Sequence, residues 1–253
     1  MSQSKGVALI TGSAQGIGRA IAIRLAQDGF DLALNDLPGK KEVLEDFAAE
    51  LRRGGESESS YHPRTCIVTC DVSKEDEVKS MIDTAVDALG SLDVMIANAG
   101  ISGMVDLLSE TLEGWDRMMK INGTSAFLCY KYAAIQMVKQ GRGGRIIGAS
   151  SMPQSPLMSY SASKFAVRAI TQAAALQLGQ YGITVNSYAP GIIATPMVVA
   201  SKSQIAKRGD KVDYFQKSGT VGQPEDVASA VAYLTSKEAH FITGKSPSHE
   251  GCV

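Results

Sequence analysis

A tyrosine and a lysine in the second half of the chain are placed so that they could transfer a proton together. Tyr160 and Lys164 occupy positions i and i+4 of a stretch with helical periodicity, so both side chains project from one face of the expected helix. A tyrosine hydroxyl, with an ordinary pKa of about 10, moves protons poorly at neutral pH unless its phenolate is stabilised. The Lys164 ammonium would stabilise the phenolate and lower the tyrosine pKa. Because such pairs also arise by accident on helix surfaces, the interpretation depends on what surrounds this one.

Hydroxyl groups that could orient a substrate carbonyl lie just before this pair. Ser150 and Ser151 follow the apolar run 145–149, and Ser151 is nine residues before Tyr160. Either serine could donate a hydrogen bond to a carbonyl oxygen, and a cap or turn role for Ser151 is the alternative. Asn122 lies within a long helical stretch, where an asparagine can kink the backbone and bind water with its carbonyl. These residue types are suited to acid–base chemistry on a carbonyl or an alcohol.

Three glycines near the N-terminus could bind a phosphate. Gly12, Gly16 and Gly18 lie between the apolar run 7–10 and the helical pattern 16–28. Glycine permits positive φ and a close approach of the backbone to a ligand, while a helix start presents unpaired N–H groups and the positive end of its dipole. A strand before the glycines and a helix after them is the context of a dinucleotide-binding turn. The pattern predicts a site for the pyrophosphate of a nucleotide cofactor.

An acidic side chain indicates which dinucleotide is preferred. Asp36 ends the second apolar run, eighteen residues beyond Gly18, where a carboxylate can accept hydrogen bonds from ribose hydroxyls and repel a 2′-phosphate. A turn-forming aspartate before Pro38 is the alternative. Because Lys40 and Lys41 could weaken the preference, NAD(H) is favoured and NADP(H) stays open as the alternative cofactor.

Strands and helices that must position these residues alternate along nearly the whole chain. Apolar, β-branched runs predict strands at 7–10, 31–35, 65–69, 94–97, 145–149 and 184–188, with a weaker one near 241–242. Helical periodicity predicts helices at 16–28, 40–53, 74–89, 112–140, 159–180 and 224–236. Such alternation predicts an α/β fold whose parallel sheet is covered by helices on both faces. No shift in composition divides residues 1–253, and the long connection at about 196–220 is expected to be a substrate lid, a solvated helix pair being the alternative.

The composition excludes several classes of protein. The 253 residues carry 25 Lys and Arg against 26 Asp and Glu, a net charge of −1, which disfavours binding to nucleic-acid phosphates. No apolar run approaches the roughly 20 residues of a membrane-spanning helix. No histidine pair has metal-ligand spacing, and neither a disulfide framework nor a zinc site fits the four cysteines, Cys66, Cys70, Cys129 and Cys252. We therefore expect a cytoplasmic protein without a metal, a nucleic-acid partner or a membrane partner.

Several motifs, in their order along the chain, are similar to those of the short-chain dehydrogenase/reductase family. The resemblance covers about residues 5–252 and is carried by Gly12-x3-Gly16-x-Gly18, Asp71-Val72, Asn98-Ala99-Gly100, Tyr160-x3-Lys164 and Pro190-Gly191 with Thr195. It implies a single-domain Rossmann fold, which is a doubly wound parallel sheet of about seven strands with helices on both faces. It also implies an assembly of several copies of the chain, a tetramer or a dimer.

The resemblance also implies roles for particular residues. Ser151, the second of the two serines, is the one that matches the family and would bind the carbonyl oxygen, and Tyr160 would act as the general acid and base. Lys164 would hold the nicotinamide ribose and lower the tyrosine pKa, and Asn122 would connect Lys164 to solvent through a water. The implied cofactor-binding residues are Gly12, Gln15, Gly16, Ile17, Gly18, Asp36, Asp71, Val72, Asn98, Gly100, Tyr160, Lys164, Pro190, Gly191, Ile193, Thr195 and Met197.

Within the family, segments 164–168, 182–186 and 190–197 resemble those of acetoin (diacetyl) reductases and 2,3-butanediol dehydrogenases. We therefore expect an NAD(H)-dependent oxidoreductase that interconverts a small ketone or diketone and its secondary alcohol. An enzyme for a polyol or a bulkier ketone is one alternative, and a non-catalytic NAD(H)-binding sensor or scaffold is another. The second alternative is suggested by the connection between Ser151 and Tyr160, about four residues shorter than is usual in the family, and by the unusual ending at 244–253.

Overall fold

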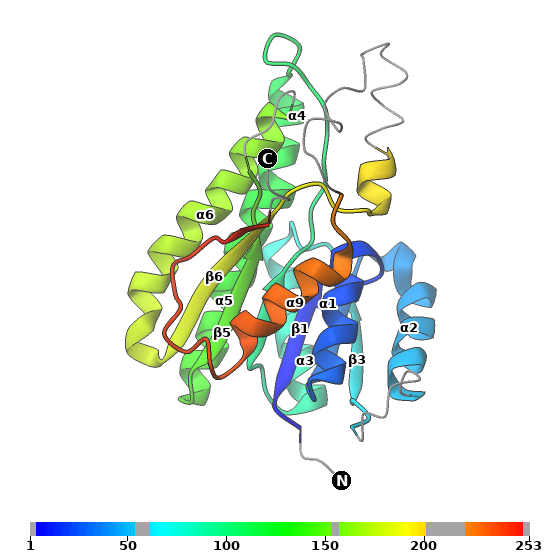
Figure 1. The fold of residues 1–253 in the computed structure, drawn as a ribbon, viewed down its shortest axis with the longest axis vertical. Coiled ribbons are helices and arrows are strands. Elements are labelled where there is room, and N and C mark those ends of the chain that lie inside the picture. The colour runs from blue at the N-terminus through cyan, green and yellow to red at the C-terminus, as the bar shows by residue number, and fades with distance from the viewer. Residues whose placement is uncertain (1–3, 54–60, 153–156, 201–220, 250–253) are drawn as a thin grey trace.

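Runs of small and β-branched residues form a parallel sheet in the computed structural model, which describes residues 4–53, 61–152, 157–200 and 221–249 (Figure 1). The strands are β1 (Val7–Thr11), β2 (Asp31–Asp36), β3 (Thr65–Thr69), β4 (Val94–Ala97), β5 (Gly144–Ala149), β6 (Ile183–Pro190) and β7 (Ser248–His249). Their order in the sheet is β3-β2-β1-β4-β5-β6-β7, and every neighbouring pair is parallel. The predicted doubly wound sheet of about seven strands is therefore confirmed.

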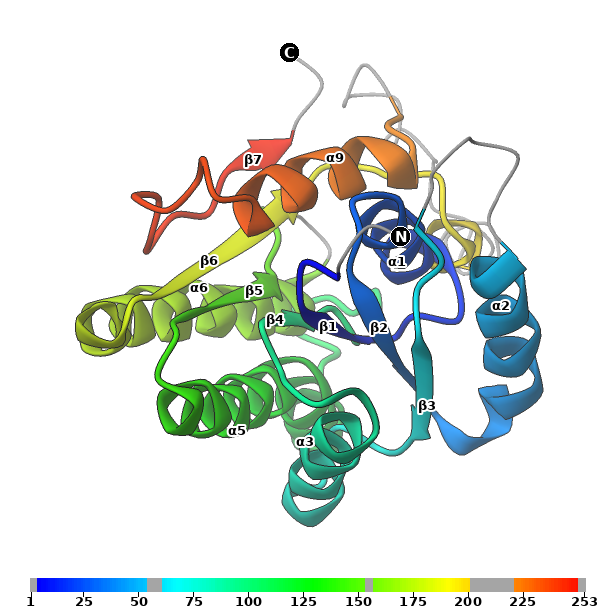
Figure 2. The ribbon, with the colours of Figure 1, turned by 90° about the horizontal axis from the view of Figure 1, so that it is seen from below.

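Helices cover the two faces of this sheet, as predicted (Figure 2). The helices are α1 (Gly16–Gln27), α2 (Lys41–Arg53), α3 (Glu75–Leu89), α4 (Leu112–Met118), α5 (Ser125–Gln140), α6 (Met158–Leu178) and α9 (Pro224–Thr235). One core lies between the sheet and α1, α2 and α9, and the other lies between the sheet and α3, α5 and α6. Successive residues of β1 alternate between them, since Ile10 belongs to the first core and Leu9 to the second.

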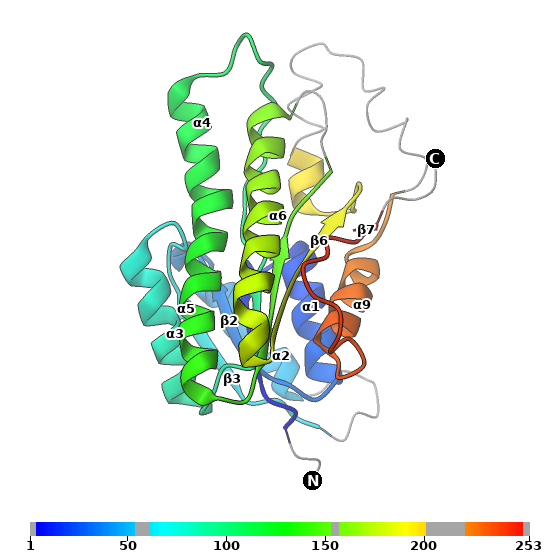
Figure 3. The same ribbon diagram turned by 90° about the vertical axis from the view of Figure 1, so that its left-hand side faces the viewer.

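The predicted helix at 112–140 is interrupted, whereas α5 and α6 run side by side without a break (Figure 3). Between α4 and α5 the chain forms a π-helical turn, Met119–Thr124, which contains Asn122. Turns of this kind widen a helix locally and often occur at functional sites. The kink that the sequence indicated at Asn122 therefore takes the form of a π turn.

The predicted strand near 241–242 is wrong, and the seventh strand is Ser248–His249 instead. Phe241 is 90% exposed, so this segment does not have the two covered faces of an inner strand. The Asn186 side chain holds the segment without a ladder, because its amide donates to the carbonyl of Ile242 and its oxygen accepts from the amide of Lys245. Most of the predicted lid, at about 196–220, lies outside the described residues. Its described part, residues 196–200, is helical.

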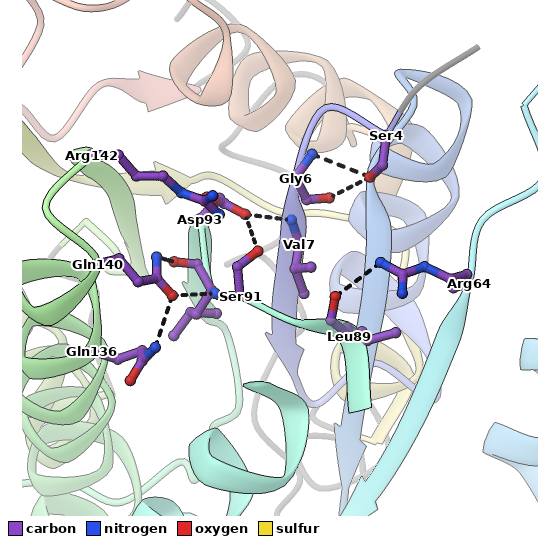
Figure 4. A network of polar contacts seen from close by, with 11 residues as sticks. Ser4, Gly6, Val7, Arg64, Leu89, Ser91, Asp93, Gln136, Gln140 and Arg142 are labelled. Carbon is purple, nitrogen blue, oxygen red and sulfur yellow. Dashed lines mark hydrogen bonds and ion pairs between the residues drawn. The ribbon is translucent and has the colours of Figure 1, made fainter. Parts of the chain in front are cut away.

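Polar side chains tie the strands together at their amino ends (Figure 4). The Asp93 carboxylate accepts hydrogen bonds from the Val7 amide at 2.8 Å, the Ser91 hydroxyl at 2.7 Å and the Arg142 guanidinium at 2.6 Å. Gln140, at the end of α5, exchanges two hydrogen bonds of 2.9 Å with the backbone of Leu92. These contacts fix the register of β1 and β4 at the end of the sheet opposite their carboxyl termini.

A buried carboxylate at the same end contributes to stability. Asp31 is fully buried and accepts hydrogen bonds from the backbone amide, Nε and Nη2 of Arg64, at 2.7 to 2.9 Å. Burial pushes the pKa of Asp31 upward, but hydrogen bonds from Tyr61 and Arg64 outweigh this effect and hold the pKa below its ordinary value of 3.8. The stabilisation is therefore present above the ordinary pKa and is lost as the pH falls through the lowered folded value.

Replacing Asp31 by Asn should lower the free energy of unfolding at pH 7 by about 2 kcal/mol, because Arg64 and Tyr61 lose a buried, charged acceptor. The matched control is Asp28→Asn, which removes an i,i+4 surface pair with Arg24 and should cost about 0.5 kcal/mol. Urea denaturation at several pH values measures both variants. The difference in the free energy of unfolding between wild type and Asp31→Asn should become smaller in acid. A difference that stays constant down to pH 3 would contradict this account.

Candidate active site

The carboxyl ends of β1 and β4 lie next to each other where the strand order of the sheet reverses, and the glycine turn lies at this point. Gly12 and Gly16 have φ angles of 67° and 57°, a region that favours glycine over other residues. α1 begins at Gly16, its N-cap Gln15 makes no side-chain cap hydrogen bond, and its first turn contains no acidic residue. The start of α1 is therefore suited to an anion.

The turn is pressed against the residue that follows β4. The Asn98 amide nitrogen donates hydrogen bonds to the carbonyls of Thr11, at 2.8 Å, and Gly12, at 3.1 Å. A Cβ atom added to Gly18 would lie 2.3 Å from the Gly12 oxygen and 2.5 Å from the Asn98 amide nitrogen. Position 18 therefore accepts only glycine, and Asn98 acts as a clamp on the turn.

The acidic residues at the ends of β2 and β3 are held by backbone amides. The Asp36 carboxylate accepts from the Ala14 amide in the glycine turn at 3.1 Å and from the Leu37 amide at 2.9 Å. It thus both faces the turn and shapes the turn that follows β2, so the two readings of the sequence are not exclusive. Asp71 accepts from the Ser73 amide at 3.0 Å, which lowers its pKa against the opposing effect of burial, and the adjacent Val72 is buried.

The structure separates the roles of the two serines. The Ser150 hydroxyl donates to the Tyr188 carbonyl at 2.9 Å and points into the fold. Ser151 shares a hydrogen bond with Tyr160, and both line one cavity. Ser151 follows the end of β5, and Tyr160 lies in the first turn of α6. These two elements bring the hydroxyls together although only nine residues separate them in the sequence.

The charges around Tyr160 differ from the expectation. Burial raises the pKa of Tyr160 above its ordinary value, while its hydrogen bond with Ser151 acts in the opposite direction. The Lys164 ammonium donates to the Ala149 carbonyl at 3.0 Å and lies 5.7 Å from the centroid of the Tyr160 ring. Burial lowers the pKa of Lys164 to about 8, and no carboxylate of the described residues compensates this desolvation. In this arrangement burial outweighs the phenolate stabilisation that the i, i+4 spacing predicted.

Asn122 and Gly100 lie close to Lys164. The Asn122 side chain exchanges hydrogen bonds of 2.8 and 3.0 Å with the backbone of Ile101 and donates to the Ser163 hydroxyl at 3.0 Å. A Cβ atom on Gly100 would lie 3.0 Å from the Asn122 oxygen and 3.1 Å from the Lys164 nitrogen. The π turn thus places the Asn122 oxygen on the same side of Gly100 as the Lys164 nitrogen.

A cavity of about 110 Å³ lies against the Ser151–Tyr160 pair. Several predicted cofactor residues line it, namely Ile17, Pro190, Gly191, Ile193, Thr195 and Met197. Apolar side chains of Met104, Leu157, Ile192 and Val198 and the polar residue Ser102 complete the wall among the described residues. That wall contains no Lys, Arg, Asp or Glu, so it suits a small uncharged molecule.

Residues with no role in the sequence analysis also build the site. The Thr11 hydroxyl accepts from the amides of Asn98 and Ala99, both at 3.0 Å, and the fully buried Tyr188 donates from its hydroxyl to the Asn98 oxygen at 2.8 Å. A tyrosine within a buried strand that also carries Asn186 and Ser187 was the available signal. In the described ranges no group of His, Cys, Asp and Glu could hold a metal ion, and no helix there is long and apolar enough to cross a membrane.

Comparison with known proteins agrees with this geometry. Residues 12–251 match the family model described as enoyl-(acyl carrier protein) reductase. A short-chain dehydrogenase/reductase of Armillaria gallica is 47% identical, over 98% of this chain and 95% of that protein. The L-2,3-butanediol dehydrogenase of Corynebacterium glutamicum is 38% identical, over 94% and 95%. A short-chain dehydrogenase from Mycobacterium paratuberculosis bound to NAD superposes with a TM-score of 0.86 at 30% identity, covering 98% of this chain and 97% of that one.

Replacing Gly18 by Ala should lower the free energy of unfolding by about 2 kcal/mol, because the added methyl group displaces the Gly12 carbonyl or the Asn98 amide. Gly179→Ala is the matched control, since a Cβ atom there meets nothing within 4 Å. Thermal and chemical denaturation of the two variants provide the measurement. Equal stability of Gly18→Ala and wild type would show that the turn is looser than the described contacts.

Proposed function

Since this chain belongs to the short-chain dehydrogenase/reductase family, we propose that it transfers hydride between NAD(H) and a small ketone or its secondary alcohol. The observation that carries the proposal is the Ser151–Tyr160 hydrogen bond on the wall of a small, largely apolar cavity that the predicted cofactor residues also line. Two hydroxyls converging on one point can bind and protonate a carbonyl oxygen.

The residues of the glycine turn fit a dinucleotide. Positive φ at Gly12 and Gly16, the missing side chain at Gly18 and the uncapped start of α1 together form a backbone cradle for a pyrophosphate. Asp36 would bind the adenosine ribose, with Asp71 and Val72 beside the adenine ring. When bound, the nicotinamide supplies or accepts the hydride.

The chain's own residues carry out the proton transfer. In reduction, Ser151 donates a hydrogen bond to the carbonyl oxygen, and Tyr160 donates its proton to that oxygen as the carbonyl carbon gains the hydride. Lys164 binds the nicotinamide ribose and stabilises the phenolate that Tyr160 leaves behind. Asn122 holds the water through which a proton returns to Lys164 and Tyr160. In oxidation the same steps run in reverse.

We propose diacetyl, acetoin and similar small carbonyl compounds as the substrate class. The cavity is small, and its described wall offers apolar side chains with few hydrogen-bonding groups beyond Ser151 and Tyr160. A polyol would leave most of its hydroxyls unpaired there, which is costly. The similarity to L-2,3-butanediol dehydrogenase supports the same class.

The non-catalytic alternative has less support. It rested on the short connection between Ser151 and Tyr160, of which residues 153–156 lie outside the described residues. The two hydroxyls are nevertheless in hydrogen-bond contact, and Lys164 and Asn122 are buried beside them. Oxidation of NADH in the presence of a panel of carbonyl compounds discriminates the two functions, because a sensor or scaffold binds NADH without turnover.

Assembly and location complete the proposal. The neighbouring helices α5 and α6 expose the large apolar side chains Phe127, Ile135, Phe165 and Leu176. Such side chains on one pair of helices support a homo-oligomer, a tetramer or a dimer, formed by this surface. The free cysteines Cys66, Cys70 and Cys129 fit the reducing cytoplasm.

Tyr160→Phe should lower kcat for diacetyl reduction by about a thousandfold, because the general acid is lost. NADH affinity should stay within about twofold, since the ring and its packing remain. Tyr181→Phe, at an exposed tyrosine beyond the end of α6, is the matched control and should retain full activity. Stopped-flow and steady-state assays of both variants test this. A Tyr160→Phe enzyme with wild-type turnover would remove Tyr160 from the mechanism.

The ratio of the kcat/KM values for NADH and NADPH tests whether Asp36 determines the dinucleotide preference. Wild type should use NADH with a kcat/KM about tenfold or more above that for NADPH, because the carboxylate repels the 2′-phosphate. Asp36→Asn, which removes the charge and keeps the size, should narrow that ratio. Asp46→Asn on the exposed face of α2 is the control and should leave it unchanged. A ratio that is the same in all three proteins would show that Asp36 has only its turn-forming role.

A further inference from the structure

Tyr188 contacts both halves of the site, although it is not among the residues that line the cavity. It lies on β6, is fully buried and belongs to the core beneath α1 and α9. Its hydroxyl donates to the side-chain oxygen of Asn98 at 2.8 Å. Its main-chain carbonyl accepts from the amide of Ser150, at 2.8 Å, and from the hydroxyl of Ser150, at 2.9 Å.

The hydroxyl contact determines which way the Asn98 carboxamide points. Burial raises the pKa of Tyr188, so the hydroxyl is protonated and acts as the donor. With its oxygen held by Tyr188, Asn98 must direct its NH₂ group at the carbonyls of Thr11 and Gly12. Without the hydroxyl, the Asn98 oxygen would be left without this donor, in a place where an unpaired acceptor is costly.

The carbonyl contact acts on the substrate side. Ser150 precedes Ser151, and its two bonds to the Tyr188 carbonyl fix the end of β5 from which Ser151 reaches Tyr160. One residue of β6 thus links the Asn98 clamp on the glycine turn with the strand end that carries the carbonyl-binding serine.

We propose that Tyr188 is a positioning residue for dinucleotide binding, whose hydroxyl orients the Asn98 carboxamide and thereby holds the glycine turn in the shape that receives the pyrophosphate. The inference rests on the proposed function in one respect, namely that the turn binds NAD(H). The phenol ring fills the core, and the hydroxyl acts through Asn98 alone.

Tyr188→Phe removes only the hydroxyl and tests this role. The dissociation constant for NADH, measured by fluorescence titration, should rise about tenfold, since the turn no longer keeps its binding shape. The KM for NADH should rise with it, whereas kcat at saturating NADH should stay within about twofold, because Tyr160 and Ser151 are unchanged. Hydrogen exchange of the backbone amides at 11–18 should be faster in the variant without any ligand.

Tyr130→Phe is the matched control. Tyr130 is also a buried tyrosine, but its hydroxyl bonds to Thr171 at 2.9 Å and to the Asn186 carbonyl at 3.3 Å, away from the glycine turn. Its loss should lower stability and leave both NADH affinity and the exchange at 11–18 unchanged. A combined Asn98→Ser, Tyr188→Phe protein should bind NADH as Asn98→Ser alone does, because the hydroxyl has no other route to the turn.

The possible failures are distinguishable. If wild type does not bind NADH, the proposed function fails, and exchange at 11–18 still decides whether Tyr188 holds the turn. If wild type binds NADH and Tyr188→Phe binds it equally well, the role of Tyr188 is overturned and the proposed function stands. Two other results would overturn the role of Tyr188, because both indicate general destabilisation. One is an equal loss of NADH affinity in Tyr188→Phe and Tyr130→Phe. The other is a loss of NADH affinity in the combined variant that equals the sum of the effects of Asn98→Ser and Tyr188→Phe.

Discussion

The contact between the Asn98 carboxamide and the carbonyls of Thr11 and Gly12 is the constraint on which the rest of the site depends. It joins the ends of the two central strands, β1 and β4, at the place where the strand order reverses. The same contact excludes any side chain at position 18, so that α1 can start close to the sheet. A small, directed amide thus determines where the positive end of α1 lies relative to β5 and β6.

Desolvation governs the other half of the site. Tyr160 and Lys164 are both shifted toward their neutral forms, because each is buried. The Ala149 carbonyl, which accepts from Lys164, and the Ser151 hydroxyl, which hydrogen-bonds to Tyr160, are polar groups that offset this cost. The protonated phenol of Tyr160 is therefore the favoured form, and it is the form that can donate a proton.

Much of this fold could be predicted from the sequence, because the local signals agree with one another. β3 and β4 begin and end at the predicted residues, and α1, α2, α3, α6 and α9 differ from prediction by at most two residues at either end. The glycine turn and the Ser151–Tyr160 pair were also predictable, since the end of a strand and the start of a helix fix each partner. The choice of Ser151 over Ser150 came from the family resemblance and stays a prediction, while the Ser150 hydroxyl has a partner in the Tyr188 carbonyl.

The features that could not be predicted depend on contacts between distant residues. The strand expected at 241–242 is wrong because Phe241 is exposed and the Ile242 carbonyl is bound by the Asn186 side chain, and no local pattern records this contact. The bond between Tyr188 and Asn98 joins residues 90 positions apart in the sequence. The raised pKa of Tyr160 follows from burial, which the i, i+4 spacing does not reveal. Local periodicity predicts elements well, whereas polar contacts across the sheet require the folded structure.

A crystal structure of the protein with bound NADH tests the central claim most directly. The account predicts the pyrophosphate at the start of α1, the adenosine ribose at Asp36 and the nicotinamide ring in van der Waals contact with the cavity beside Tyr160. A dinucleotide bound elsewhere on the sheet, or a nicotinamide ring directed away from the Tyr160 hydroxyl, would contradict it.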